Sequence, residues 1–174
     1  MKVIIDRFRD YRKTLISLLR SRKNQVILEL LQNQNDNMST KNLFDAARKG
    51  RLDQVQRLVE RLEDKNPLNE DGITPLHYAA SFGHLSIVKF LLPFLSNKNP
   101  KSGAQWDERT PLHQAAIYGH LHIVEYLIEQ IEGDINPAQS DGATVLHLAA
   151  EGGHLNVVSF YTNRLPNPNP GYLT

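Results

Sequence analysis

Six histidines of this sequence form two regularly spaced series of three. Imidazole side chains can bind metals or transfer protons near neutral pH. The chain has seven histidines, and neighbours within each series are 34–36 residues apart. If each histidine belongs to a separate stacked unit, neighbours are about 10 Å apart, too far to share a metal with bonds of roughly 2 Å. We therefore expect structural imidazoles in both series and a surface position for the seventh, His122. The two series are His77, His113 and His147, and His84, His120 and His154.

The other reactive groups do not form a catalytic arrangement. Asp107 and Glu108 are adjacent, but an acid–base carboxylate pair needs a pocket that raises one pKa, and a solvated loop offers none. The chain has no cysteine, which excludes disulfides and thiol catalysis. It also lacks a phosphate-binding glycine loop and a Gly-x-Ser-x-Gly turn. We predict a protein that is not an enzyme and that needs no cofactor and no metal.

An internal repeat defines the elements that must hold these residues. The segment at residues 71–85 recurs at 107–121 and 141–155, and a shorter copy lies at 43–52. In the complete copies a threonine, followed twice by proline, predicts the start of a helix, and a glycine predicts its end. An apolar second helix follows. Self-similarity at this period indicates stacked units of two short helices rather than a single core.

The Thr-Pro-Leu-His-x-Ala motif and its period resemble the ankyrin repeat. The resemblance covers roughly residues 41–165 and implies an all-α solenoid of helix-turn-helix units with finger loops. We expect an N-terminal helical extension in addition, on the apolar spacing described below. In this family imidazoles bond the threonine and the adjoining loop backbone. We expect a basic extension and linker at 1–37, repeats at 38–166, and at 167–174 a tail or the start of a further repeat. The repeat units are expected at about 41–66, 67–99, 100–136 and 137–166.

Two departures from the repeat pattern predict local differences. Glu108 stands where the other complete copies have Gly72 and Gly142, a turn position that often needs positive φ. The connection before it is also longer, so we expect a reshaped third finger loop. In the last unit, Phe160 and Tyr161 are expected to replace the leucine pair of the second helix.

The resemblance implies that first helices and finger loops line a concave groove that binds partners. Exposed Trp, Tyr and Arg often dominate such interfaces, so we expect Phe82, Trp106, Ile117 and Tyr118, with Arg109, to anchor a protein or peptide. Packing between repeats is the alternative for Phe82 and Tyr118. Acidic residues on this face disfavour nucleic acid and favour a basic, apolar peptide. The predicted partner-binding residues are Arg48, Lys49, Glu70, Asp71, Ile73, Phe82, Trp106, Asp107, Arg109, Ile117, Tyr118, Ser140, Asp141 and Glu151.

The near-neutral charge of the chain conceals two different segments. Residues 1–25 hold eight basic and two acidic side chains, whereas residues 26–174 hold twelve basic and seventeen acidic ones. The 4-3-4-3 spacing of the N-terminal apolar residues predicts a helical seam. That helix has three alternative uses: a cap on the first repeat, self-association or partner binding, or attachment to an acidic membrane or targeting, which Asp6 and Asp10 disfavour. The seam residues are Ile4, Phe8, Tyr11, Leu15 and Leu18.

An alternative function therefore assigns oligomerisation or targeting to the N-terminal helix and leaves the repeats as a spacer. The sequence has no stretch of about 18 consecutive apolar residues, so we expect no membrane insertion and an intracellular, cytoplasmic protein. Residues 171–174 resemble the start of another repeat, which suggests a piece of a longer array, and Met38 is an alternative start. The identity of the partner stays open because one fold serves many functions.

Overall fold

The computed structural model describes residues 39–165. Its contacts divide the chain into residues 1–40 and residues 41–174, and the second unit is described here by itself. Expectations about the N-terminal seam, Met38 and residues 167–174 lie outside the described residues. Across the described part the elements are helices and loops, with no strand and a single isolated bridge between Ala138 and Thr144. The expected all-α class is confirmed.

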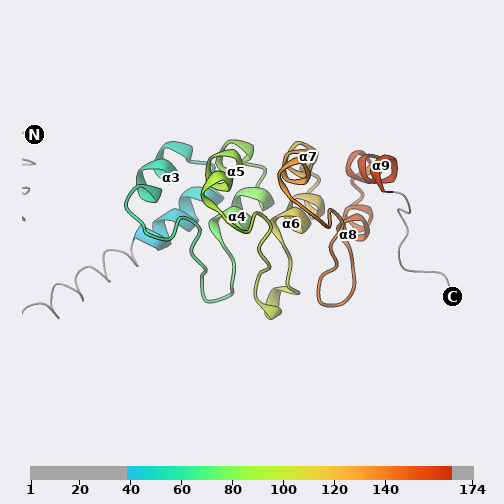
Figure 1. Cartoon of the computed structure of the whole chain (residues 1–174), viewed down its shortest axis with the longest axis horizontal. Coiled ribbons are helices and arrows are strands. Elements are labelled where there is room, and N and C mark those ends of the chain that lie inside the picture. Colours follow the sequence, from blue (N-terminus) through green and yellow to red (C-terminus); the bar gives the residue numbers. More distant parts are fainter. Residues whose placement is uncertain (1–38, 166–174) are drawn as a thin grey trace, which may run out of the picture. The chain divides into compact units, whose positions relative to one another are not determined.

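The helices come in pairs, each with a short first helix and a second helix that runs back beside it. Residues 39–48 are helical and precede α3. In Figure 1 the second helices α3, α5, α7 and α9 form one row, while α4, α6 and α8 form another below it. The bounds are α3 Leu52–Val59, α4 Pro75–Ser81, α5 Leu85–Leu91, α6 Pro111–Ile117, α7 Leu121–Gln130, α8 Val145–Glu151 and α9 Leu155–Arg164, with 3-10 turns η1 Leu92–Phe94 and η2 Ala104–Trp106.

Each complete repeat starts its first helix with the same cap. The backbone N–H of His77 donates to Thr74 Oγ1, and the N–H of Thr74 donates to His77 Nδ1 at 3.2 Å, which forms a capping box. Thr110 and Thr144 make the same reciprocal cap. These bonds satisfy donors that every helix start leaves open. The predicted starts of α4, α6 and α8 are therefore confirmed.

A left-handed glycine ends each of these helices. Gly83, Gly119 and Gly153 have φ of 77°, 71° and 73°, values that only glycine adopts without cost. The chain then turns into a second helix that begins after a histidine. Local sequence thus fixes both ends of a helix of about two turns.

Stacking of the first helices buries small residues between repeats. Ala79, Ala80, Ala115 and Ala116 have no exposed surface, and α4 packs against α6 as α6 packs against α8. Small side chains permit this close approach, while larger aliphatic residues of the second helices fill the space behind them. The core is therefore continuous from one repeat to the next.

Asparagines tie the connecting loops to the helices. Oδ1 of Asn66 accepts a hydrogen bond from the backbone N–H of Leu76 at 3.0 Å. Asn99 and Asn136 do the same for Leu112 and Leu146. Each amide side chain satisfies a donor in the first turn of the following helix.

The register expected for the last helix is wrong by one residue. Tyr161, not Phe160, takes the position of Leu91 and Leu127, and it is completely buried. Its hydroxyl donates to the carbonyl of Ile135 at 2.8 Å, and burial raises its pKa. The second residue of the pair is the exposed Thr162, because the register counts from the histidine that begins the helix.

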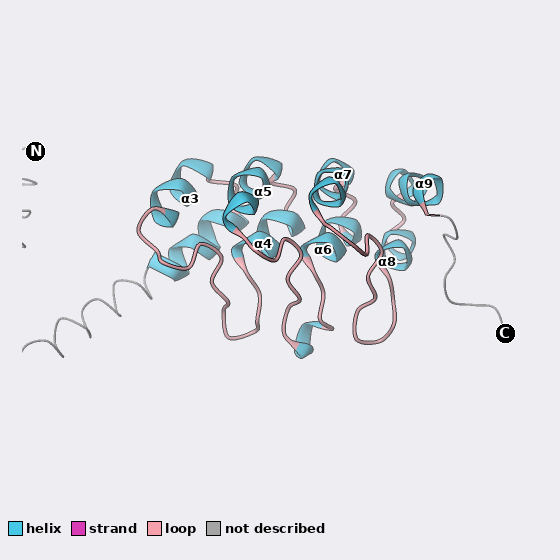
Figure 2. Ribbon diagram, viewed as in Figure 1, coloured by secondary structure: helices cyan, strands magenta, loops and turns pink. Residues whose placement is uncertain are grey.

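The loops between repeats project away from the helices on the side of α4, α6 and α8 (Figure 2). We name them the second finger, residues 67–73, the third finger, residues 100–109, and the fourth finger, residues 137–143. They carry eight of the fourteen predicted partner-binding residues.

Candidate partner-binding site

The third finger differs from its neighbours in its backbone. The second and fourth fingers turn at Gly72 and Gly142, with φ of 69° and 87°. The third finger instead contains η2, followed by Asp107 at φ 59° and Glu108 at φ 54°. The expected positive φ at Glu108 is confirmed, and Asp107 shares it. Two successive non-glycine residues in the left-handed region store strain, so the surroundings must hold this loop in place.

Contacts from both neighbouring fingers supply that hold. On one side, the N–H of Gly103 donates to the carbonyl of Asp71 at 3.0 Å, and Gln105 Nε2 donates to Asp71 Oδ1 at 3.2 Å. On the other, the N–H of Ser140 donates to the carbonyl of Asp107 at 2.9 Å. Gly72 is also required here, because a Cβ on it would lie 2.5 Å from Gly103 N.

Arg109 completes the connection between the third and fourth fingers. Its Nε donates to Gln139 Oε1 at 3.0 Å, and a second guanidinium nitrogen donates to Asp107 at 3.0 Å. Gln139 Nε2 in turn donates to Asp141 Oδ1. The N–H of Ala143, together with this bond from Gln139, holds the pKa of Asp141 below its usual value. Arg109 therefore holds the fingers in place, and it is less available as a partner anchor than we expected.

Trp106 lies at the end of η2 in this finger, and 43% of its surface is exposed. Phe82 and Tyr118 are 51% and 55% exposed. They occupy equivalent positions at the ends of α4 and α6. Packing between repeats, the alternative for these two aromatic residues, accounts for only part of their surface. Ile117 is half-buried.

Histidines of the following repeat fix the backbone beside these aromatic side chains. Nε2 of His120 donates to the carbonyl of Ser81 at 3.1 Å, and Nε2 of His154 donates to the carbonyl of Ile117 at 2.8 Å. His84 makes the same bond to Arg48 at 3.0 Å. Burial lowers the pKa of His120.

In the other histidine series, His77 and His113 are buried, whereas His147 is half-buried. His77 Nε2 donates to the carbonyl of Arg109 at 3.0 Å, and His113 Nε2 donates to Pro137 at 2.9 Å. Burial lowers both pKa values to about 4. Both ring nitrogens are thus occupied in structural bonds. Over residues 39–165 no group of three His, Asp or Glu side chains is arranged to hold a metal ion.

The predicted residues fall into two sets, one on the finger loops and one at the ends of the first helices. The finger set lies on loops that the bonds described above connect, and it comprises Glu70, Asp71, Trp106, Asp107, Arg109, Ser140 and Asp141. The helix-end set comprises Arg48, Lys49, Phe82, Ile117, Tyr118 and Glu151, which precede the left-handed glycines. The prediction that Ile73 binds a partner is corrected. Only 7% of this residue is exposed, because it directly precedes the cap residue Thr74, where the finger enters the interior. Ile73 therefore leaves the candidate site.

The amides Gln105 and Gln139 are positions that sequence reasoning missed. They stand where the second finger has Asn69, whose Oδ1 accepts from the N–H groups of Asp71 and Ile73. A recurring amide at one repeat position was the available signal. The lysine–carboxylate pair between Lys101 and Glu108, at 2.6 Å, also went unpredicted.

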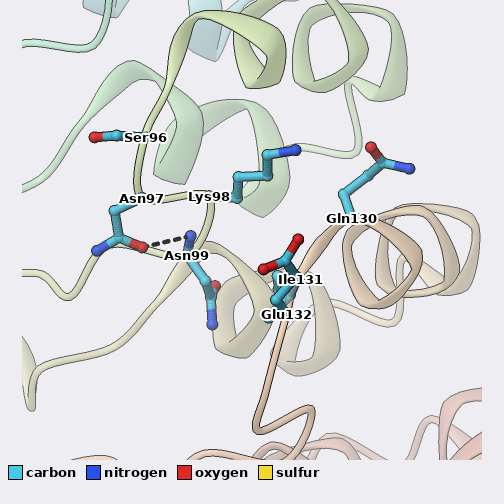
Figure 3. A pocket seen from close by; sticks show the side chains of 7 residues that line it. All are labelled: Ser96, Asn97, Lys98, Asn99, Gln130, Ile131 and Glu132. Atoms are coloured by element: carbon cyan, nitrogen blue, oxygen red, sulfur yellow. Dashed lines mark hydrogen bonds between the residues drawn. The ribbon is translucent and has the colours of Figure 1, made fainter.

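A polar cavity of about 320 Å³ is lined by residues that belong to neither set (Figure 3). It is formed by the connectors that follow α5 and α7, and Asn97 Oδ1 accepts from the N–H of Asn99 at 3.0 Å on one wall. None of the predicted residues lines it. The lining residues are Ser96, Asn97, Lys98, Asn99, Gln130, Ile131 and Glu132.

These features define a class of protein: stacked helix pairs that display loops and helix ends from a fixed framework. The family "Ankyrin repeats (3 copies)" matches residues 15–102, 43–136 and 93–164. The chain belongs to the ankyrin repeat family, whose fold generally mediates protein–protein interaction without enzymatic activity. No helix in the described part of the chain has the length and apolar character needed to cross a bilayer.

Known proteins match parts of the chain. Human "Apoptosis-stimulating of p53 protein 2" is 44% identical over 57 residues, which cover 33% of this chain and 5% of that protein. The mouse "RelA-associated inhibitor" is 41% identical over 64 residues, 37% of this chain and 8% of the relative. Mouse "Ankyrin repeat domain-containing protein 49" is 39% identical over 71 residues, 40% and 30% respectively. The chain thus matches only a small part of each relative.

Proposed function

We propose that this chain is a non-enzymatic binding module that holds a partner protein through the exposed aromatic residues Phe82, Trp106 and Tyr118. One observation carries the proposal: three large hydrophobic side chains keep about half of their surface in water on positions that the stack does not require. Such exposure costs free energy that a partner can recover by covering the rings. Trp and Tyr are also the residues that most often dominate interfaces.

The rigidity of the display supports the same proposal. The third finger is bonded to both neighbours, and the helix ends are bonded to histidines of the next repeat. A surface held in one conformation loses little entropy on binding. The carboxylates Glu70, Asp71 and Asp141, on the fingers that flank the third finger, favour a basic and apolar peptide over nucleic acid.

Alanine substitution tests this proposal against a purely structural role for the rings. Affinity capture followed by mass spectrometry compares the full chain with the triple variant Phe82→Ala, Trp106→Ala, Tyr118→Ala. For a partner identified in this way, Trp106→Ala and Tyr118→Ala should each lose about 2 kcal/mol or more of binding, with little change in melting temperature.

Phe94→Ala is the matched control, because Phe94 is 52% exposed but lies in η1 after the second helix. It should leave binding unchanged. If Trp106→Ala and Tyr118→Ala instead melt early and bind normally, the rings serve packing and the proposal fails. Because Trp106 is the only tryptophan of the chain, its fluorescence reports directly on this surface.

A further inference from the structure

The residues before the left-handed glycines form a series that we name the helix-end row. It contains the two residues that precede Gly50, Gly83, Gly119 and Gly153, all with positive φ. Each of these positions is exposed or half-buried. Along the chain the row reads Arg48–Lys49, Ser81–Phe82, Ile117–Tyr118 and Glu151–Gly152. Its chemistry changes in order from cationic to aromatic, aromatic and anionic.

The row has a regular spacing and a fixed backbone. Neighbouring first helices pack directly, α4 on α6 and α6 on α8, so equivalent positions are about 8–10 Å apart. The carbonyls of Arg48, Ser81 and Ile117 each accept a bond from a histidine of the following repeat, at 3.0, 3.1 and 2.8 Å. The side chains are therefore presented at regular intervals along roughly 30 Å.

The two ends of the row carry opposite net charge. Arg48 and Lys49 both pair with the single carboxylate of Asp45, at 3.3 and 2.8 Å, which leaves one positive charge in excess. These pairs are exposed and contribute little stability, so a ligand carboxylate can compete for the cations. At the other end Glu151 is exposed, and among the described residues it has no ion-pair partner. Phe82 and Tyr118 lie between these charges.

We propose that the helix-end row binds one linear segment of a partner protein with the opposite charge order: a carboxylate over Arg48 and Lys49, apolar side chains against Phe82 and Tyr118, and a Lys or Arg over Glu151. This inference rests on the proposed function and makes it more specific, because it specifies the order of charges in the bound segment along the row. The facing side chains must recur about every 10 Å, as they do at seven-residue intervals of an α-helix or three-residue intervals of polyproline II.

Selection from a phage library of random 20-residue peptides tests the charge order on the full chain. Peptides selected on the unaltered protein should carry an acidic and a basic residue on either side of apolar ones. Selection on Glu151→Lys should replace the basic residue by a second acidic one, and selection on the double variant Arg48→Glu, Lys49→Glu should remove the acidic residue. Each variant should bind the originally selected peptides at least tenfold more weakly.

Glu129→Lys is the charge-matched control, because Glu129 is exposed on the second helix α7 and should not alter the selected peptides. The altered residues are all exposed, and equal melting temperatures will show that the variants fold.

Two results separate failure of this inference from failure of the proposed function. If Phe82→Ala and Tyr118→Ala abolish peptide binding while the charge reversals leave the selected sequences unchanged, the aromatic site stands and the charge order is overturned. If the aromatic substitutions leave binding intact, or if the unaltered chain selects no peptide, both are overturned.

Discussion

The third and fourth repeats share one motif but differ in what covers them. Ala116 has no exposed surface, whereas its counterpart Ala150 is exposed. Leu121 is half-buried, and Leu155 is 77% exposed. A Cβ on Gly119 would collide with the ring of His154, while a Cβ on Gly153 would meet nothing within 4 Å among the described residues.

This difference shows that the motif determines the fold of a unit, while the following unit determines its burial. Thr110 and Thr144 form the same capping box, since the cap needs only residues within one repeat. The burial of Ala116 instead requires α8 beside it. Much of the stability of the stack must therefore come from contacts between repeats, and four experiments test where it is located.

Acid should cause the largest loss of stability. It should act through repeats that a following repeat covers. Because the folded pKa values of His77 and His113 are about 4, against about 6.5 unfolded, the unfolded chain binds more protons between these values. The free energy of unfolding then has its full value above pH 6.5 and falls as the pH drops toward 4. Between pH 7 and 4.5 the loss should be about 2–3 kcal/mol per histidine, measured by urea unfolding at each pH.

His113→Gln provides the internal check on this acid effect. The variant should be less stable at pH 7, because Thr110 and Pro137 lose their imidazole partner. Its stability should nevertheless depend on pH about half as steeply as that of the unaltered chain. An equal dependence in both proteins would assign the acid effect to other groups.

Enlarging equivalent alanines should have the second-largest effect. The loss of stability should differ between the third and fourth repeats. Ala116→Leu places added methylene groups in a closed interface and should cost about 1–3 kcal/mol. Ala150→Leu changes an exposed position and should stay within about 0.5 kcal/mol. Thermal and urea unfolding measure both. Equal losses would mean that the exposed face of α8 is covered in solution.

Substitutions of equivalent glycines should give a smaller difference in stability between the two repeats. Gly119→Ala and Gly153→Ala both place a side chain at positive φ, which costs roughly 1–2 kcal/mol. Only Gly119→Ala also collides with His154, and loss of the bond to Ile117 should add about 1 kcal/mol. Combining each substitution with His154→Ala tests the cause, because the difference between the two glycines should then vanish.

The smallest effect concerns the finger loops. Glu108→Gly gives the third finger the residue that the second and fourth fingers have at this turn. Relief of the positive-φ strain should exceed the entropy cost of glycine slightly, for a gain of less than about 1 kcal/mol. Urea unfolding measures the gain, with Lys101→Ala as the control for the lost pair with Glu108. A clear loss of stability would show that the turn is unstrained.

The sequence predicts those parts of the fold that depend on neighbours in the chain. The ends of α4 and α6 follow from Thr74–Pro75 and Gly83 and from their counterparts, because capping and left-handed turns are local. The register at Tyr161 was predicted wrongly, since an apolar pair gives two equally good alignments until it is counted from His154.

The candidate site was less predictable, because it depends on contacts between repeats. The exposure of Phe82, Trp106 and Tyr118 agrees with their position outside the repeat motif. The burial of Ile73 and the bonds of Arg109 to Gln139 and Asp107 involve side-chain directions that periodicity does not specify.

The histidine bonds have a consequence for transplanting this surface to other scaffolds. The bonds of His84, His120 and His154 run from one repeat to a carbonyl of the preceding repeat, as from His154 to Ile117, whereas those of His77 and His113 run to the following repeat. A single sequence repeat cut at its motif boundaries would therefore lose the bond that fixes its own display position. The smallest graft that keeps Tyr118 in place must extend from the third finger through His154, so the portable unit of this solenoid is longer than its sequence period.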